Sequence, residues 1–156
     1  MNKRTWMVVL WVVAVALVAV AADDPQLGTW KVNLAKSKFS PGPAPKSQIL
    51  KWEAAGTNGT KSTSEIVDAQ GKTMKGGYTA TYDGKDAPWA GNPDADTISL
   101  KRIDPSTVEA TWKKAGKVTN TSRRVVSPDG KTMTVTQKGT DAKGQAVNNV
   151  IVLDKQ

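Results

Sequence analysis

The chain contains no cysteine and no histidine among its 156 residues. Without cysteine it has no disulfide framework, no thiol nucleophile and no thiolate metal ligand. Without histidine it also lacks the commonest general base and metal ligand. Its three glutamates, Glu53, Glu65 and Glu109, stand in alternating segments that also carry Lys or Thr, which is typical of exposed strand faces. We therefore expect no catalytic residue, no metal, no cofactor and no enzymatic activity.

Long hydrophobic runs are missing except at the N-terminus. There, two basic residues precede an apolar run from Trp6 to Val18, and Ala19-Val20-Ala21 fits the small-x-small cleavage pattern. The apolar stretch reaches Ala22 and is 17 residues long, so an uncleaved membrane anchor is the alternative. The cleavage pattern favours a signal peptide of residues 1–21 and a single mature domain of residues 22–156. We expect an exported protein, periplasmic or secreted, with no membrane span after cleavage.

The charge balance is basic but not clustered. Cleavage would remove Lys3 and Arg4 and lower the formal charge from +8 to +6. A basic protein is a candidate for nucleic acid or a membrane surface. Here the lysines are scattered over turns and strand segments, with no run of more than two. This distribution predicts a solvated surface with guarded strand edges, and no nucleic-acid partner.

Helical periodicity is also missing from the mature chain, which instead has glycine-bearing polar turns at short intervals. Asp83-Gly84-Lys85 and Asp129-Gly130-Lys131 are examples, and Asp or Asn before Gly suits a two-residue hairpin. The segments between the turns alternate polar and apolar residues, most clearly from Thr73 to Tyr82. This pattern predicts an all-β fold, an antiparallel up-and-down β-barrel of about 8–10 strands, because an open meander would leave edges exposed. The expected strands are 28–33, 47–55, 60–68, 73–82, 97–103, 108–112, 117–126, 132–138 and 145–153, with 87–90 as a short tenth candidate.

Two connections are longer than hairpins. Ala35 to Pro45 contains Ser40-Pro41-Gly42-Pro43-Ala44-Pro45, and Pro88 to Asp96 contains Gly91-Asn92-Pro93. Proline excludes both from a helix interior or an inner strand. Each is either a lid over a barrel mouth or a plain surface crossover.

The opening strand carries a Gly-x-Trp motif, Gly28-Thr29-Trp30, ahead of the meander. This arrangement resembles the lipocalin and fatty-acid-binding-protein (calycin) group of ligand-carrying barrels. Gly28 to Ser47 is also similar to the "GTWKLN-AKSKF-PGPAPKS" opening of small exported bacterial lipocalin-like proteins, a group without a settled activity. The resemblance implies a barrel that carries a small hydrophobic or amphipathic molecule. Gly28 and Trp30 are predicted to form a structural plug at one end, since an indole supplies apolar area and an N–H for a nearby carbonyl.

The chain departs from these families at their ligand-binding positions. Fatty-acid-binding proteins hold the ligand carboxylate with an Arg and a Tyr two residues apart on the last strand, where this chain has Ile151 and Leu153. Lipocalins place an Arg over the first-strand Trp near the end of the barrel, and no Arg follows Arg124 here. The Pro-rich loop replaces the two-helix lid of the fatty-acid-binding proteins.

The predicted ligand-binding residues are two arginines and four aromatic residues. Arg123 and Arg124 are adjacent, so a regular strand turns one of them inward, where an unpaired guanidinium is costly and suits an anionic ligand. A bulge or strand end would instead leave both in solvent. Four aromatic residues are expected either to line the ligand site or to belong to an ordinary core. They are Trp52, Tyr78, Tyr82 and Trp112.

Composition and pattern together predict an exported, non-enzymatic binding protein. The alternative is a protein that binds a protein partner, as an inhibitor does, through its loops. A cavity lined by the four aromatic residues would favour the first, and a filled barrel with an exposed apolar patch around Phe39 and Trp89 would favour the second. An inward pair of Arg with Asp or Glu at a pocket floor would instead indicate an enzyme.

Overall fold

The computed structural model describes residues 24–156, and the predicted signal peptide, residues 1–21, lies outside the described residues. A single 3-10 turn, Leu34–Lys36, follows the first strand. The strands are β1 (Gly28–Val32), β2 (Ser47–Ala54), β3 (Gly59–Val67), β4 (Thr73–Thr81), β5 (Asp83–Ala90), β6 (Thr97–Asp104), β7 (Thr107–Lys114), β8 (Lys117–Val126), β9 (Thr132–Thr140) and β10 (Ala146–Lys155).

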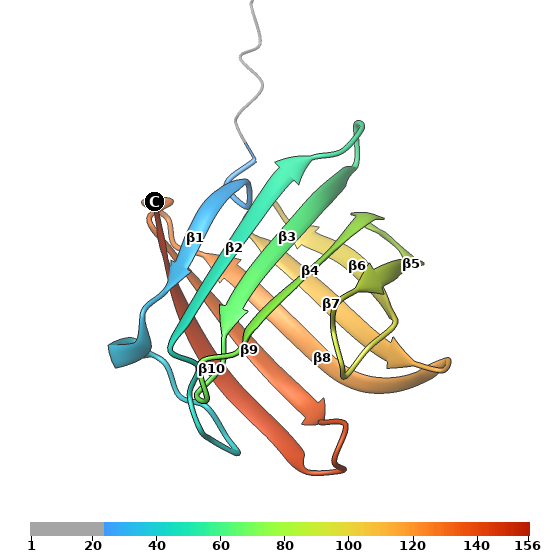
Figure 1. The fold of residues 1–156 in the computed structure, drawn as a ribbon. Helices are drawn as coiled ribbons and strands as arrows, with labels where there is room; N and C mark the ends of the chain where they lie inside the picture. The colour runs from blue at the N-terminus through green and yellow to red at the C-terminus, as the bar shows by residue number, and fades with distance from the viewer. Residues whose placement is uncertain (1–23) are drawn as a thin grey trace, which may run out of the picture.

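The strands form a closed barrel in which each is antiparallel to the next along the chain (Figure 1). The ring closes where β1 pairs with β10, with Trp30 opposite Lys155 and Val32 opposite Leu153. Every strand therefore has two neighbours, which removes the open edges of the meander. The predicted all-β, up-and-down antiparallel barrel is confirmed.

Nine of the expected strands agree with the structure to within two residues at each end. The short candidate at 87–90 is the last part of β5, which begins earlier, at Asp83. The first half of β5 is polar and exposed, so it carries no alternating signal. Its pairing is also weak, because β4 and β5 pair only at Gly77–Ala90 and Tyr78–Trp89.

The two ends of the barrel differ in their connections. The turns after β2, β4, β6 and β8 lie at the same end as residues 24–27, and we call it the closed end (top of Figure 1). The other connections lie at the opposite end, which we call the mouth. They include both of the long connections expected from the sequence, now bounded at 33–46 and 91–96.

The buried apolar residues form two clusters on different arcs of the barrel. One comprises Trp30, Val32, Trp52, Val126, Met133, Ile151 and Leu153, from β1, β2 and β8 to β10. The other comprises Tyr78, Ala80, Tyr82, Ile98, Leu100, Val108 and Ala110, from β4, β6 and β7 with the β4–β5 turn. The apolar faces of the alternating strands thus point inward, as the period of two requires.

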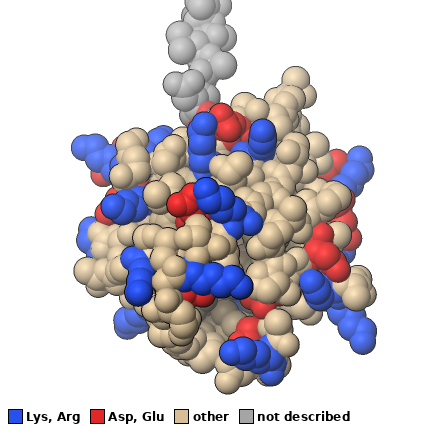
Figure 2. Space-filling model, in the orientation of Figure 1, with Lys and Arg blue, Asp and Glu red and all other residues tan. Residues whose placement is uncertain are grey.

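On the face drawn in Figure 2, charged side chains cover the surface without gathering into a single patch. In Figure 2 Lys and Arg are spread over the visible face, several of them beside Asp or Glu. Each of the three glutamates pairs with a basic neighbour on the surface, in Lys51–Glu53, Lys75–Glu65 and Arg123–Glu109. No helix among residues 24–156 is long and apolar enough to cross a membrane.

Candidate ligand cavity

A cavity of about 450 Å³ occupies the barrel interior and extends to the mouth. Inward side chains of β2 to β10 line it, together with residues of the long mouth loops. This volume falls within the range of sites that bury small organic molecules. Three groups of lining side chains differ in chemistry: an aromatic wall, a row of amides and a basic floor.

The aromatic wall consists of Tyr78, Trp89 and Trp112. Trp89 lies edge-to-face against both neighbours, with ring centroids 5.3 Å from Tyr78 and 4.8 Å from Trp112. Each contact has the T-shaped geometry that the charge distribution of aromatic rings favours. Because the rings hold one another, the wall presents a rigid apolar surface to the cavity.

The amide row consists of Asn120, Gln137 and Asn149 on β8, β9 and β10. The Gln137 Nε2 donates to Asn120 Oδ1 at 3.1 Å, and Asn149 Nδ2 donates to Gln137 Oε1 at 3.2 Å. The outer members are tied to the backbone, since Asn120 Nδ2 donates to the Thr140 carbonyl and Asn149 Oδ1 accepts from the Ser40 N–H. Gln137 and Asn149 line the cavity.

Arg124 forms the basic floor, on the closed-end side of the cavity. It is only 6% exposed, and it is the one charged residue that is buried among residues 24–156. Its Nε donates to Gln26 Oε1 at 2.9 Å and its Nη1 to Tyr78 Oη at 3.2 Å, while the guanidinium lies 4.7 Å from the centre of the Trp52 ring. Its Nη2 is buried without a hydrogen-bond partner.

The floor has no counter-ion in the described part of the chain. No Asp or Glu of residues 24–156 lies within salt-bridge distance of Arg124, whose partners Gln26, Tyr78 and Trp52 are all neutral. A buried guanidinium in this state is costly, because desolvation is only partly offset by neutral hydrogen bonds and the aromatic face. The cavity floor therefore carries an uncompensated positive charge.

Strand alternation decides which arginine faces inward. β8 keeps a regular register with β9 at this point, with Arg123 opposite Thr136 and Arg124 opposite Val135. Adjacent residues on a regular strand face opposite sides. Arg123 thus lies outside, where its Nη1 donates to Glu109 Oε1 at 2.9 Å. The prediction of Arg123 as a ligand-binding residue is corrected on this ground.

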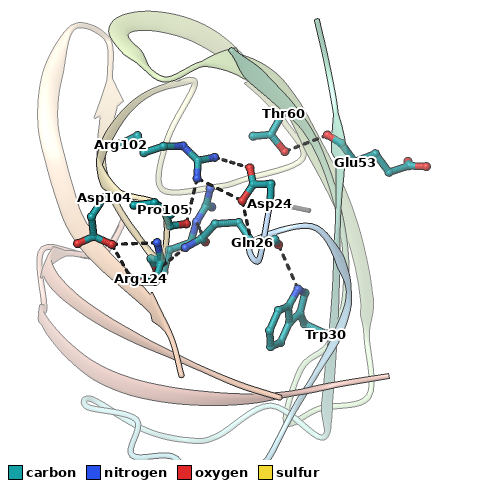
Figure 3. A network of polar contacts seen from close by, with 10 residues as sticks. Asp24, Gln26, Trp30, Glu53, Thr60, Arg102, Asp104, Pro105 and Arg124 are labelled. Atoms are coloured by element: carbon teal, nitrogen blue, oxygen red, sulfur yellow. Dashed lines mark hydrogen bonds and ion pairs between the residues drawn. The ribbon is translucent and has the colours of Figure 1, made fainter. Parts of the chain in front are cut away.

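The N-terminal segment lies at the closed end, with Gln26 beside Arg124 (Figure 3). Gln26 is fully buried, and its Nε2 donates to the Ser106 carbonyl at 2.6 Å. Trp30 is also fully buried, and its Nε1 donates to the Gln26 carbonyl at 3.2 Å. The Asp24 carboxylate accepts from both terminal nitrogens of Arg102. The Gln26 side chain therefore connects the end seal to the cavity floor.

Gly28 and Lys155 complete the surroundings of Trp30. Gly28 has φ +123°, a conformation that favours glycine, and a Cβ there would lie 2.9 Å from Lys155 Cε. The Lys155 ammonium lies 5.2 Å from the centre of the Trp30 ring. A cation therefore covers the first-strand Trp, although the chain has no Arg after Arg124 to supply it.

The predicted aromatic residues separate into two groups. Trp52, Tyr78 and Trp112 line the cavity. Tyr82 does not, because it lies beyond the cavity toward the closed end, where Arg102 stacks 4.0 Å from its ring centre. Tyr82 is therefore a residue of the core, and its assignment to the ligand site is corrected.

The long mouth loops contribute to the cavity instead of forming a separate surface patch. Phe39, Pro43 and Pro45 of the first and Asn92 and Pro93 of the second line its outer part. Phe39 also packs against the apolar cluster at β1, and Trp89 belongs to the aromatic wall. The two residues expected to mark an exposed partner-binding patch therefore both face the cavity.

Sequence reasoning missed three residues that matter at this site. Gln26 precedes the first strand, Gln137 is a polar residue in a barrel interior, and Lys155 replaces the expected Arg. The signal for Gln137 was present, because Met133, Val135 and Gln137 share one face of β9. An amide at the next alternate position after two inward apolar residues is expected to face inward as well.

Acidic residues near the mouth act as turn caps. Asp94 Oδ1 accepts from the Ala142 N–H, and Asp96 Oδ2 accepts from the Ala115 N–H. Among the described residues, no group of three or more Asp or Glu side chains is arranged to hold a metal ion. These carboxylates stabilise the connections around the mouth.

Comparison with known proteins bears on the fold alone. No protein-family model matches the chain, and no curated protein matches its sequence. Similar solved structures include a redesigned beta barrel, with a TM-score of 0.51 and 12% identity over 85% of this chain and 92% of that one. Rv2717c from M. tuberculosis gives a TM-score of 0.50 and 14% identity over 85% and 93%. The zebrafish ileal bile acid-binding protein complexed with cholic acid gives 0.47 and 10% over 85% and 99%. At these identities the matches bear on the fold alone, and the redesigned beta barrel supports the closed β-barrel architecture of this chain.

Proposed function

We propose that this protein is an exported, non-enzymatic carrier that holds a small acidic amphipathic molecule inside its barrel. The observation that carries the proposal is the buried guanidinium of Arg124, which has no counter-ion among residues 24–156 and lies at the floor of a cavity of about 450 Å³. An acidic head group would compensate this charge, and the apolar part of the ligand would lie along the aromatic wall toward the mouth.

The hydroxyl of Tyr78 supports an anionic head group at the same place. Its oxygen accepts from Trp52 Nε1 at 3.1 Å and from Arg124 Nη1 at 3.2 Å. A phenolic oxygen that accepts two hydrogen bonds still has its own proton to donate. Arg124 and Tyr78 would therefore both offer donors to one anion.

Binding without catalysis is favoured by the neutral surroundings of Arg124. An acid–base site at the floor would need an Asp or Glu beside the arginine, whereas its partners are Gln26, Tyr78 and Trp52. The pair Asp24–Arg102 lies beyond the cavity lining, in the seal of the closed end.

Titration of tryptophan fluorescence with palmitic acid and with its alcohol tests the head-group contact, because Trp52 lies beside Arg124. A charge-assisted contact contributes on the order of 1.5–3 kcal/mol, so Arg124→Met should weaken palmitic acid about 10- to 150-fold. The alcohol should be affected far less. Arg123→Met is the matched control, since it removes the adjacent but external guanidinium and should bind both ligands like the wild type.

Two results would overturn the carrier proposal. One is the absence of any fluorescence change with either ligand in the wild type. The other is unchanged affinity for the acid in an Arg124→Met protein that melts as a folded domain. Either result would move a protein partner, bound through the mouth loops, ahead of a small ligand.

Export is proposed from the N-terminal sequence, and it needs its own test. Expression of the full chain in a bacterial host should yield a soluble species that lacks about the first 21 residues, which intact-mass analysis would detect. A full-length species in the membrane fraction would instead indicate an uncleaved anchor.

A further inference from the structure

We infer that the ligand also carries a hydroxyl group in the middle of its chain, recognised by the amide row. The inference rests on the proposed function, since it concerns the same cavity and the same acidic ligand. The amide row would distinguish a hydroxylated acid from a plain alkyl acid. The floor and the aromatic wall would bind both kinds of acid alike.

The cavity-lining part of the amide row lies across the barrel from Tyr78 and Trp89 of the aromatic wall, whereas Asn120 is the cross-strand neighbour of Trp112. In the ring of ten strands, β10 is halfway round from β5, and β9 is halfway round from β4. Asn149 and Gln137 on β10 and β9 thus face Trp89 and Tyr78 on β5 and β4. A ligand between the two walls has one apolar side and one side next to hydrogen-bonding groups.

The amides have hydrogen-bonding capacity beyond the bonds that they make to each other. Gln137 uses one N–H toward Asn120 and one lone pair toward Asn149. A side-chain amide has two N–H donors and two lone pairs, so Gln137 keeps one of each. Asn149 likewise uses one N–H and one lone pair. Gln137 is nevertheless only 8% exposed, so these groups depend on whatever fills the cavity.

The register places the amide row at mid-height in the cavity. Asn149 is opposite Gln137, and Gln137 is opposite Ser122 on β8. Ser122 also lines the cavity, two residues from Arg124 on the same strand. Two residues of an antiparallel strand span about 7 Å, so the row lies well above the floor toward the mouth. A ligand with its acid at Arg124 would pass the row with the middle of its chain.

Hydrogen bonding then decides which ligand the cavity prefers. A plain alkyl chain against the amide row would displace the water that hydrogen-bonds to the unused amide N–H and C=O groups. It would form no hydrogen bonds in place of those lost. A hydroxyl at that height would both donate and accept. The cavity should therefore favour the hydroxylated acid, although the plain acid is the more hydrophobic of the two.

The test compares palmitic acid with a set of its monohydroxy derivatives, each with the hydroxyl at a different carbon. In the wild type, a mid-chain hydroxyl should bind about 3- to 10-fold tighter than palmitic acid, and a hydroxyl at either end of the chain should give no advantage. Gln137→Leu should abolish or reverse the mid-chain preference. Arg124→Met should weaken all of the acids together.

A second variant guards against loss of folding in Gln137→Leu, which leaves Asn120 and Asn149 without their partner. Ser122→Ala removes one hydroxyl of the same height and keeps the amide row, and it should reduce the mid-chain preference about 2- to 3-fold.

The outcomes separate the two proposals. Equal affinity of the wild type for palmitic acid and all its hydroxy derivatives would overturn the inference and leave the carrier function standing. So would a mid-chain preference that survives both variants, because the amide row would then serve only to fix the mouth loops. Failure of every acid to bind would overturn the carrier function and the inference with it.

Discussion

At the closed end of the barrel a fully buried amide joins the N-terminal segment to two distant parts of the chain, whereas the amides around the cavity bond to one another and to the mouth connections. Gln26 is fully buried, and its side chain bonds to both Ser106 and Arg124. Gln137 is almost as buried, and its two side-chain bonds among residues 24–156 go to the other two amides of the row. The two regions therefore differ in what their buried amides connect, and not in how completely their polar groups are satisfied, because the Tyr82 hydroxyl at the closed end is buried without a hydrogen-bond partner among residues 24–156.

Arg124 stands at the boundary between the two regions. Its Nε is bonded to the closed-end residue Gln26, and its Nη1 to the cavity residue Tyr78. The remaining Nη2 has no hydrogen-bond partner among residues 24–156. The closed end therefore fixes the position of the guanidinium, which lines the cavity.

The comparison predicts the largest loss of stability at the end seal. Trp30→Ala should lower the free energy of unfolding by about 3–5 kcal/mol, because it removes a fully buried indole and leaves a cavity. Trp89→Ala is the matched control in the cavity, where the ring is only half-buried, and should cost less than half as much. Urea denaturation of both variants gives the values. Equal losses would show that the two regions do not differ in packing.

Gln26→Leu tests the polar part of the seal. The change leaves Arg124 Nε without its partner and removes one of the two hydrogen bonds to the Ser106 carbonyl, which still accepts from the Val126 N–H. Leaving a buried charged donor unsatisfied should cost about 2–3 kcal/mol. The same substitution at Gln48, a half-buried residue that lines the cavity, should change the free energy of unfolding little or raise it. Thermal and urea denaturation of the pair measure the contrast. A similar cost at both positions would contradict the assignment of Gln26 to the seal.

The sequence predicts features that depend on neighbouring residues better than features that depend on contacts between residues far apart in the chain. Strand positions depend on alternation and on turn residues, which are local, and nine strands were predicted to within two residues. The first half of β5 was missed because its residues are polar and its only ladder pairs with β4 are formed by its last two residues. In the sequence, alternation shows that either Arg123 or Arg124 faces inward, but it does not show which of the two does so.

The closed end was the less predictable of the two regions, because its contacts join distant parts of the chain. Gln26 and Arg124 are separated by 98 residues and Asp24 and Arg102 by 78, so no local pattern relates them. Lys155, and not the arginine typical of lipocalins, supplies the cation beside Trp30. Tyr82 was placed in the cavity because alternation gives the face of a residue but not its height in the barrel.

At the mouth, Gly91→Ala should destabilise the protein by about 1–2 kcal/mol or more, because φ of +76° strains any other residue. The added Cβ would also lie 2.0 Å from the Lys75 carbonyl oxygen, so the backbone of β4 would have to move. Gly84→Ala at the closed end is the control. Its φ is +82° with nothing within 4 Å, so it should cost only the conformational strain. If Gly84→Ala costs as much as Gly91→Ala in urea denaturation, the close approach at the cavity rim is not the cause.

The smallest expected effect concerns the turns of the closed end in acid. Asp83 accepts from the Thr81 hydroxyl and from Lys85, and these bonds lower its pKa from 3.8 to about 2. Asp104 and Asp129, in the next two turns of the same end, have pKa values lowered chiefly by the hydroxyls of Ser106 and Ser127. A carboxyl whose pKa is lower in the folded state stabilises the fold above its unfolded pKa, and this contribution is lost as the pH falls through the folded pKa. For Asp83 the loss should therefore occur between about pH 4 and pH 2.

Asp83→Asn removes this titration and tests whether ionised turn caps help to hold the closed end. The variant should be slightly less stable than the wild type at pH 6, and the difference should shrink as the pH falls from 4 toward 2, because the wild type loses its own contribution there. Urea denaturation at pH 6, 4 and 2.5 measures the two curves, and amide hydrogen exchange shows which end opens first. We expect faster exchange in acid at the turns after β4, β6 and β8 than at the mouth connections. A constant difference between the two proteins at all three pH values would mean that the Asp83 carboxylate does not stabilise the fold through its charge.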